Sequence, residues 1–377
     1  MHALSPEGPD APSGLYAALS PATPAPHASP ADHAACREAI RAGSRSFHAA
    51  SLLLPPTVRR AAYGLYAFCR FSDDAVDDAA AHTRAGTVAR LEARLARAYA
   101  GDPADFPPDR ALADIVAAHA IPRALPGALL EGLAWDAQGR RYETLSDLCA
   151  YAARVAASVG AMMTLIMGVR DASVLARACD LGVAMQLTNI ARDVGEDARA
   201  GRLYLPLAWL REAGIDPDAF VAEPGATPAL AGLVARLLAV ADGLYARSEA
   251  GIAALPPACR PAIRAARLIY AEIGREVERG GLDPVRSRAR VAGPRKALLL
   301  LRAGLPRLAR AEPPAPCLRE TRFLVEAVPE PGPSWRAAWW DVNGQIVRVL
   351  DMIEVLRERE SLDRTSLVRD PLAHEAT

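Results

Sequence analysis

Two clusters of acidic residues interrupt segments that are otherwise apolar and helix-forming. The first cluster occupies residues 73–78 and the second residues 189–197, and apolar side chains such as Leu65, Leu181 and Ile190 flank them. Apolar flanks draw such helices toward a core, where carboxylates must find partners. The chain therefore has to fold so that positive charge reaches two half-buried acidic sites.

The spacing of these residues gathers them on helix faces. Asp73 and Asp77 are four residues apart, and Asn189, Asp193 and Asp197 form a stripe over two turns. Like charges at this spacing repel one another, and a place near a helix C-terminus is also unfavourable for negative charge. Carboxylate and amide oxygens suit Mg²⁺, which keeps several waters and bridges to substrate phosphates. The pattern predicts a Mg²⁺ site, with Mn²⁺ as an alternative, rather than a solvated acidic surface.

Composition favours an all-α fold and excludes several classes of function. Ala and Leu dominate the 377 residues and aromatic residues are 5%, which favours long helices over strands. No glycine-rich phosphate loop of a common nucleotide-binding type is present. A net charge of zero with scattered basic residues argues against a nucleic-acid partner. Six cysteines without close spacing predict neither a zinc site nor disulfides, and they favour a cytoplasmic location.

The chain is expected to have three parts. Residues 1–30 are rich in Pro and Ala and are expected to be a disordered tail, and residues 31–305 are expected to form a single large helical domain. After Pro55 and Pro56, Thr57 is a plausible N-cap of the first acidic helix. The expected helices cover residues 57–80, 85–100, 110–119, 125–139, 146–169, 172–198, 228–253 and 258–279.

Residues 306–377 are expected to be a Pro-rich linker and an amphipathic helix of unknown role. Trp335, Trp339 and Trp340 precede an apolar helical face that runs from Ile346 to Leu356. These tryptophans suit peripheral contact with the inner membrane. The charges around the apolar face balance, which favours packing on the core instead.

The two acidic motifs resemble the signatures of the squalene and phytoene synthase family. The resemblance rests on residues 73–78, on Gln186-Leu187-Thr188-Asn189-Ile190-Ala191-Arg192-Asp193-Val194-Gly195-Glu196-Asp197, and on Gly201-Arg202-Leu203-Tyr204-Leu205-Pro206. Further similarity lies in residues 43–47, 151–160 and 255–270, so that it spans residues 33 to 300. It implies a single domain of the isoprenoid synthase type with a central cavity.

The resemblance also implies an activity. The second signature is most similar to bacterial members that make phytoene, which are prenyltransferases of carotenoid biosynthesis of the 15-cis-phytoene synthase type. Such an enzyme joins two molecules of geranylgeranyl diphosphate head to head by way of prephytoene diphosphate. It releases two diphosphates and needs no NADPH, whereas squalene synthases finish with a hydride from NADPH.

The resemblance assigns site residues by position. Metal binding and catalysis fall to Asp73, Asp77, Asp193 and Asp197, with Asn189 as a further metal ligand. The substrate-binding set consists of Ser44, Arg45, Ser46, Phe47, Tyr66, Arg70, Val155, Val159, Gly160, Gln186, Asn189, Arg192, Arg202, Tyr270 and Arg288. Its arginines would hold diphosphate, and its apolar members would line the prenyl chain.

Two other functions compete with this one. A presqualene diphosphate or dehydrosqualene synthase would have the same site with a shorter pocket for farnesyl diphosphate. A catalytically inert prenyl-lipid binding or scaffold protein would keep the fold alone. The intact carboxylates of both motifs argue against the inert protein, because without chemistry nothing favours the retention of destabilising charges.

Overall fold

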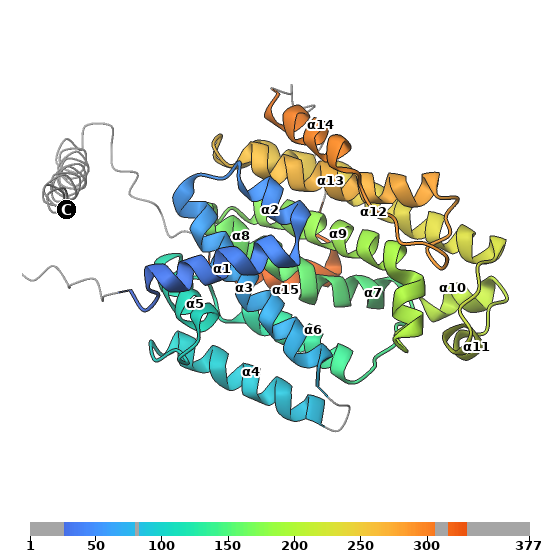
Figure 1. Ribbon diagram of the computed structural model, residues 1–377, viewed down its shortest axis with the longest axis horizontal. Coiled ribbons are helices and arrows are strands. Elements are labelled where there is room, and N and C mark those ends of the chain that lie inside the picture. Colours follow the sequence, from blue (N-terminus) through green and yellow to red (C-terminus); the bar gives the residue numbers. More distant parts are fainter. Residues whose placement is uncertain (1–25, 80–82, 306–315, 330–377) are drawn as a thin grey trace, which may run out of the picture. The chain divides into compact units, whose positions relative to one another are not determined.

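The protein is built from helices throughout the part of the chain that the structure describes. The computed structural model describes residues 26–79, 83–305 and 316–329, and every regular element in these ranges is helical (Figure 1). This confirms the all-α class that the composition predicts. The residues outside these ranges include the expected N-terminal tail up to residue 25 and the tryptophans and apolar face beyond residue 330.

Most helices are long enough to bury one face along several turns. The elements are α1 (Pro30–Gly43), α2 (Arg45–Ser51), α3 (Pro56–Asp77), α4 (Arg84–Tyr99), α5 (Pro107–Ala118), α6 (Ala124–Ala137), α7 (Leu145–Ala152), the π-helix η2 (Ala153–Ala157), α8 (Ser158–Ile166), α9 (Ala172–Arg199), α10 (Leu207–Glu212), α11 (Pro217–Ala222), α12 (Pro228–Ala254), α13 (Arg260–Arg279), α14 (Gly293–Gly304), the 3-10 helix η3 (Arg319–Thr321) and α15 (Arg322–Glu326).

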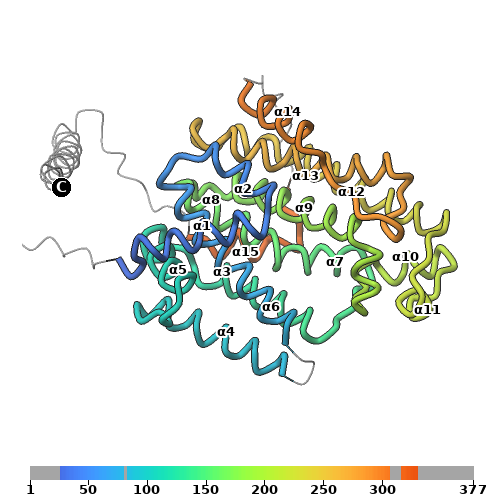
Figure 2. The backbone as a smooth tube through the Cα atoms, viewed as in Figure 1, coloured from blue at the N-terminus to red at the C-terminus, as the bar shows by residue number. Residues whose placement is uncertain are grey.

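Helix α9 is the centre of the fold. It packs against α8, η2, α12 and α13, and the backbone trace shows it crossing the middle of the bundle (Figure 2). Two stretches, Leu145–Ile166 and Pro228–Ala254, are long and apolar enough to cross a membrane by length and composition. Both pack against α9, which explains their apolar composition as that of core helices.

The structure corrects several expected details of the helices. Helix α3 begins at Pro56 with Pro55 at the N-cap and no side-chain cap, so Thr57 is not the N-cap, and the helix ends at Asp77. The single helix expected over residues 146–169 contains the π-helical turn η2 and ends at Ile166. Helices α1, α2, α10, α11, α14 and α15 have no counterpart among the expected helices. Of these, α2, α10, α11 and α15 are only five to seven residues long, too short for a periodic signal.

Residues 316–329 return to the bundle after the undescribed residues 306–315. Helix α15 packs against α8 and α9, and its Leu324 is fully buried. A buried ion-pair group supports this return: Asp180 on α9 binds Arg177 and Arg247, and both guanidinium groups donate to the carbonyl of Pro316. The described end of the chain is therefore attached to the central helix.

Candidate active site

The two acidic motifs lie in the last turns of the helices that carry them. Asp73 and Asp77 are in the final turns of α3, which ends at Asp77. Asp193 and Asp197 are in the final turns of α9, which ends at Arg199. Both motifs therefore lie where the helix dipole disfavours acidic side chains, as the sequence indicated. Positive charge from elsewhere in the chain has to offset this.

Arginines supply that charge to both motifs. Arg202, just after α9, donates to Asp77 on α3 at 2.7 Å and so joins the two motif regions. Arg192 donates to Asp193 at 2.7 Å, and on α3 Arg70 pairs with Asp74 at 2.6 Å. Paired arginine forks of this kind are also the groups that bind phosphate oxygens well.

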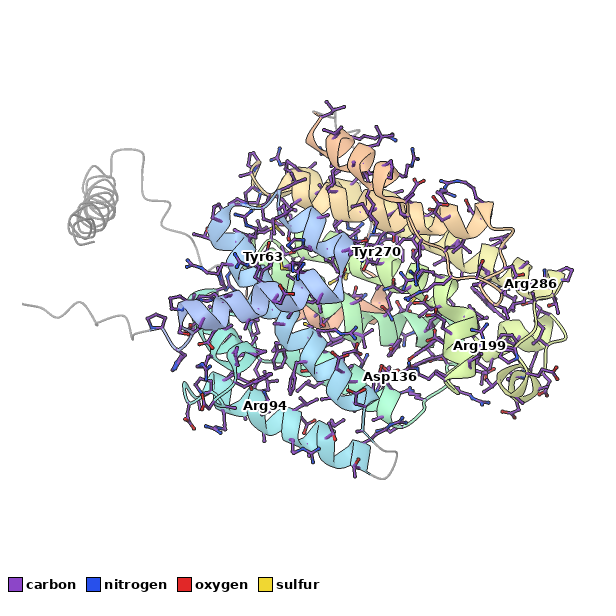
Figure 3. The ribbon with its side chains drawn as sticks, in the orientation of Figure 1. Tyr63, Arg94, Asp136, Arg199, Tyr270 and Arg286 are labelled. Carbon is purple, nitrogen blue, oxygen red and sulfur yellow. The ribbon has the colours of Figure 1, made fainter. Side chains whose placement is uncertain are left out.

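Arg288 approaches the second motif from a distant part of the chain. Its guanidinium binds both oxygens of Asp193, at 2.8 and 3.1 Å, and lies 3.4 Å from Glu196. Gly195 makes this approach possible, because a Cβ at that position would lie 2.6 Å from the Cα of Val285. Arg199 then donates to the carbonyl of Val285 and holds the loop against α9; Figure 3 shows Arg199 and Arg286 on the same side of the molecule.

The site contains a third acidic element that the motifs did not reveal. Asp136 lies in the last turn of α6 (Figure 3). It accepts hydrogen bonds from the hydroxyls of Tyr151 and Tyr204, each at 2.8 Å. Burial raises the pKa of Asp136 to about 6 against the opposing effect of these hydrogen bonds, and the negative charge of Asp73 raises it further. A single Asp in an apolar helix has no spacing signal, although the motif neighbour Tyr204 and the matched Tyr151 surround it.

The carboxylates of the two motifs influence one another. Enclosure by the protein raises the pKa of Asp73 to about 6 although 48% of its side chain is exposed, and the charge of Asp77 adds to this. Burial raises the pKa of Asp197 to about 7, with further contributions from Asp193 and Asp136. Arg202 opposes the rise at Asp73 and at Asp197, which places all of these groups around one guanidinium. The site therefore concentrates negative charge that nearby cations would stabilise.

The donor set fits a hard divalent cation that brings other ligands with it. The side-chain oxygen Oδ1 of Asn189 is buried without a hydrogen-bond partner and lies on α9 one turn before Asp193. Among the described residues, no three Asp, Glu, His or Cys side chains are gathered closely enough to hold an ion by themselves. Mg²⁺ usually takes one or two carboxylates and completes its octahedron with water and substrate phosphate. The residues present fit that mode of binding.

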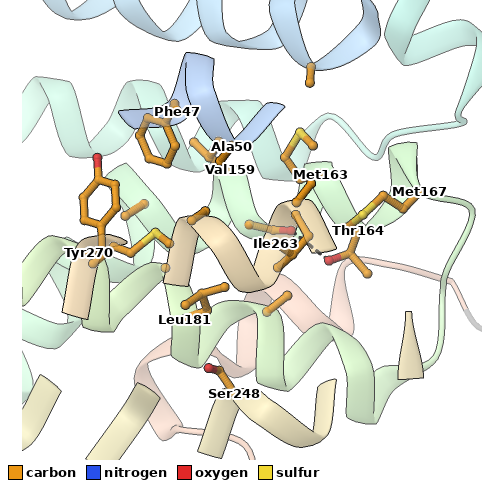
Figure 4. A pocket seen from close by; sticks show the side chains of 18 of the residues that line it. Phe47, Ala50, Val159, Met163, Thr164, Met167, Leu181, Ser248, Ile263 and Tyr270 are labelled. Carbon is orange, nitrogen blue, oxygen red and sulfur yellow. Dashed lines mark hydrogen bonds between the residues drawn. The ribbon is translucent and has the colours of Figure 1, made fainter. Parts of the chain in front are cut away.

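An apolar cavity of about 300 Å³ begins beside this acidic site. Gln186 and Asn189 line the cavity, and Asn189 precedes Asp193 by one turn of α9, so a molecule in the cavity can reach the carboxylates. Figure 4 shows Phe47 and Tyr270 at one part of the wall and Met163, Thr164 and Met167 at another. Phe47 and Tyr270 stack with their ring centroids 4.9 Å apart.

Close helix contacts shape the cavity wall. A Cβ at Gly182 would lie 2.6 Å from the Cα of Ala157, and one at Gly160 would lie 2.8 Å from the carbonyl oxygen of Ala178. The chain therefore brings α9 against η2 and α8 at backbone distance. The π-helical turn of η2 lies directly before Val159 and Gly160, which line the cavity. Such turns are frequent at functional sites.

The structure divides the expected substrate-binding residues into two groups. Those that line the cavity are Phe47, Tyr66, Val155, Val159, Gly160, Gln186, Asn189 and Tyr270. Those that pair with the acidic motifs are Arg70, Arg192, Arg202 and Arg288.

The remaining three expected residues lie at the start of α2. Ser44 is the N-cap and accepts a hydrogen bond from the backbone N–H of Phe47, so it has a clear structural role. Arg45 is exposed and Ser46 is partly buried. None of the three lines the apolar cavity.

Comparisons with known proteins agree with this geometry. A sequence model described as squalene/phytoene synthase matches residues 40–296. The chain is 56% identical to a phytoene synthase of Cereibacter sphaeroides over 69% of this chain and 75% of that protein. It is 54% identical to a phytoene synthase of Rhodobacter capsulatus over 73% of this chain and 81% of that protein.

Solved structures show the same fold. A dehydrosqualene synthase in complex with a ligand has 32% identity and a TM-score of 0.66, with 72% of this chain and 95% of that chain covered. A squalene synthase from Alicyclobacillus acidocaldarius has 28% identity and a TM-score of 0.61, with 67% and 94% covered. The chain therefore belongs to the squalene/phytoene synthase family, as its two acidic motifs predicted.

Proposed function

We propose that this protein condenses two molecules of geranylgeranyl diphosphate to phytoene and releases two diphosphates. The observation that carries the proposal is the junction of an apolar cavity with a site of paired carboxylates and arginines. The relatives at 54–56% identity, which carry the name phytoene synthase, support this product. The enzyme is thus a prenyltransferase of carotenoid biosynthesis.

The charged residues bind and orient the diphosphate end of the substrate. Arg192, Arg202 and Arg288 present guanidinium groups within 3 Å of motif carboxylates, so they already point into the site. Guanidinium forks stabilise the negative charge that develops as the allylic carbon–oxygen bond breaks. Their role is to hold the leaving diphosphate where the carbocation forms.

Mg²⁺ is the proposed cofactor, with Mn²⁺ as an alternative. Asp73, Asp77, Asn189, Asp193 and Asp197 would hold it together with phosphate and water oxygens, and when bound it neutralises charge on the leaving diphosphate. The unsatisfied Oδ1 of Asn189 and the raised pKa values of Asp73 and Asp197 support this assignment.

The apolar wall keeps water from the reacting carbons. A carbocation in water would be captured as an alcohol, whereas Val155, Val159 and Met163 offer it no nucleophile. The electron balance needs no reductant, because two ionisations release two diphosphates and two protons are lost, one as the cyclopropane of prephytoene diphosphate forms and one as the final double bond forms. NADPH is therefore not part of the proposed reaction.

A second candidate substrate is farnesyl diphosphate. A dehydrosqualene synthase is the structural neighbour with 32% identity, and its fold covers 72% of this chain. The phytoene synthases are considerably more similar in sequence, so the longer substrate is preferred. The crowded carboxylates of the site destabilise the free protein, and an inert binding function would not require them.

The decisive experiment supplies purified full-length protein with Mg²⁺ and either geranylgeranyl or farnesyl diphosphate, without NADPH. We expect a C40 hydrocarbon with the mass of phytoene from the longer substrate, and no product when EDTA removes the metal. A product from farnesyl diphosphate alone would assign the enzyme to the shorter substrate. A folded protein without product from either substrate would contradict the proposal.

We propose a cytoplasmic location. All six cysteines are free thiols, which suits a reducing compartment. The test is fractionation of cells that express the full chain, with separate assays of the soluble and membrane fractions. Secretion of the folded protein would contradict the proposal.

A further inference from the structure

Large apolar side chains are exposed in two segments that lie together. Leu52 and Leu53 follow α2, and Leu298, Leu301 and Leu305 belong to α14 and its end; we call these five residues the leucine face. Leu301 is 73% exposed, Leu305 62% and Leu52 53%. Among the described residues, only Phe323 is a further exposed side chain of this kind.

The two segments meet over helix α13. Ala50 at the end of α2 and Ala303 at the end of α14 both pack in one buried cluster with Ala265 of α13. Figure 1 shows α14 lying along α13. Arg264 of α13 donates to the carbonyls of Ala303 and Leu305 and fixes the end of α14. The two segments that carry the exposed leucines therefore share a common buried cluster.

Helix α14 has two apolar faces, one buried and one exposed. Leu299 and Ala303 are buried against α13, whereas Leu298, Leu301 and Leu305 have the three- and four-residue spacing of another helix face and are exposed. A helix that only needed to pack on α13 would place polar residues on that second face. The second face is thus apolar without a partner in the described part of the chain.

Positive charge surrounds the leucine face. Neither residues 44–72 nor residues 284–305 contain an Asp or Glu, although the whole chain has a net charge of zero. Of the basic residues in these segments, Arg45, Arg60, Lys296 and Arg302 form no ion pair with any described acidic residue. The nearest acidic side chains belong to neighbouring helices: Glu38 of α1 lies near Arg37 and His48, and Glu272 of α13 pairs with Arg295.

A basic pocket adjoins the leucines at the junction of α1, α2 and α3. It is lined by Pro30, His33, Ala34, Arg37, His48, Leu52, Pro56, Arg59, Arg60 and Tyr63, which include no carboxylate. Leu52 belongs both to this pocket and to the leucine face, and its carbonyl accepts a hydrogen bond from Arg59 at 3.3 Å. An exposed leucine thus lies directly beside a cluster of basic side chains.

We propose that the leucine face and the basic pocket dock the protein on a bilayer that contains anionic phospholipid. The leucines enter the boundary of the acyl chains, and the pocket binds lipid phosphate through Arg37, Arg59 and Arg60. Buried apolar area together with basic residues is the combination that binds anionic membranes. The surface differs from the tryptophan segment considered from the sequence, and it lies in the described domain.

The position of the substrate cavity agrees with this surface. Ala50, Ser51 and Leu54, next to Leu52 and Leu53, line the cavity, and so do Ile263 and Ala266 of α13. Figure 4 shows Ala50 and Ile263 at the cavity. The wall between the cavity and the proposed bilayer is therefore one layer of helix and loop. A C40 hydrocarbon is insoluble in water, so release toward lipid would suit the reaction proposed above, although docking itself does not depend on that reaction.

The test is co-sedimentation of the full chain with vesicles, without substrate. We expect binding to phosphatidylcholine vesicles that contain phosphatidylglycerol and little binding to phosphatidylcholine alone. The double variant Leu301→Ser/Leu305→Ser removes exposed apolar area, and Arg37→Gln/Arg60→Gln removes two unpaired charges. Each should weaken partitioning by roughly tenfold or more.

Matched controls separate docking from general charge and from catalysis. Arg90→Gln/Arg123→Gln removes two exposed charges near α4 and α6 and should leave partitioning unchanged. All variants should keep the melting temperature and the activity in detergent, since the substituted residues do not line the cavity. Failure of the wild-type chain to bind anionic vesicles, or equal loss in the control, would overturn the proposal. So would leucine variants that changed oligomeric state but not vesicle binding.

Discussion

The acidic residues of the site differ in how the surrounding protein neutralises them. Asp193 is held by Arg192 and Arg288, and Asp77 by Arg202. Asp197 forms no ion pair within 4 Å among the described residues, and burial raises its pKa to about 7. Single substitutions at these positions should therefore have different effects on activity and on stability.

Asp73→Asn and Asp193→Asn should each abolish most of the activity. Each change removes a proposed metal ligand while the volume stays nearly constant, so we expect a loss of about 10²–10³-fold in kcat/KM. The measurement is hydrocarbon formation from geranylgeranyl diphosphate. Asp102→Asn, at an exposed position beside Arg97, serves as the control and should be nearly neutral. Wild-type rates in both motif variants would disprove the assigned site.

Asp197→Asn should stabilise the metal-free protein at neutral pH. Because the pKa of Asp197 is raised from 3.8 to about 7, the folded state holds a proton that the unfolded state has lost, and the free energy of unfolding falls as pH rises between these values. The variant does not lose stability in this way, so above pH 7 its free energy of unfolding should exceed that of the wild type by about 1–2 kcal/mol.

The check on Asp197 is urea unfolding in EDTA at several pH values. The advantage of Asp197→Asn over the wild type should be small near pH 4, grow up to pH 7 and stay constant above it. An advantage that did not change with pH would show that the pKa of Asp197 is not raised.

The spacing of the acidic residues on helix faces is visible in the sequence without a structure, whereas the arginines were assigned through the family resemblance. The contact between Arg288 and Asp193 depends on a loop held by Gly195 and Arg199, which no local spacing indicates. Asp136 was missed because its neighbours Asp73 and Asp197 come from other helices. Contacts between residues on different helices cannot be read from the spacing of residues within one helix.

At the scale of helices, α9 and η2 approach one another backbone to backbone beside the cavity. Gly182 lies against the backbone of Ala156 and Ala157, and a Cβ there would be 2.6–2.8 Å from their atoms. The helices could accommodate an added methyl group only by moving apart. Movement of η2 would displace the wall that Val155 and Val159 contribute.

Gly182→Ala should destabilise the fold by about 1–3 kcal/mol despite the better helix propensity of Ala. The matched control is Gly243→Ala in α12, where nothing lies within 4 Å of the added Cβ, and this change should stabilise by about 0.5–1 kcal/mol. Thermal unfolding of both variants gives the comparison. If Gly182→Ala stabilised the protein as the control does, this result would contradict the close approach of α9 and η2.

The presence of the long helices could be predicted from the sequence more reliably than the residues at which helices begin and end. The long periodic segments of α4, α9, α12 and α13 agree with expectation within two residues at each end. The start of α3 was misplaced at Thr57, because its beginning depends on Pro55 and Pro56 rather than on a capping side chain. The π-helical turn of η2 was invisible, since one inserted residue leaves the apolar pattern almost intact.

At the scale of the whole molecule, the described end of the chain contributes to the core. Leu324 of α15 is fully buried, and Pro316 receives hydrogen bonds from Arg177 and Arg247. Sequence alone placed this segment in a linker, because its few residues carry no periodic signal. Residues 316–329 are thus part of the folded unit.

Leu324→Ala should destabilise the protein by about 2–4 kcal/mol, as for other large-to-small changes at buried sites. Arg319→Ala, at an exposed position in η3, is the control and should change stability by less than about 0.5 kcal/mol. Denaturant unfolding measures both. A neutral Leu324→Ala would indicate that α15 is not attached to the bundle in solution.

The arginine–carboxylate pairs of the free site imply that substrate binding is an exchange of partners. In the free site, Arg192, Arg202 and Arg288 are paired with carboxylates. When a diphosphate binds together with its cations, the guanidinium groups can pair with the diphosphate and the carboxylates can bind the cations. Charge in the pocket then balances before and after binding, so few bulk ions are taken up or released. Substrate affinity should accordingly respond weakly to ionic strength, although the site is among the most highly charged regions of the molecule.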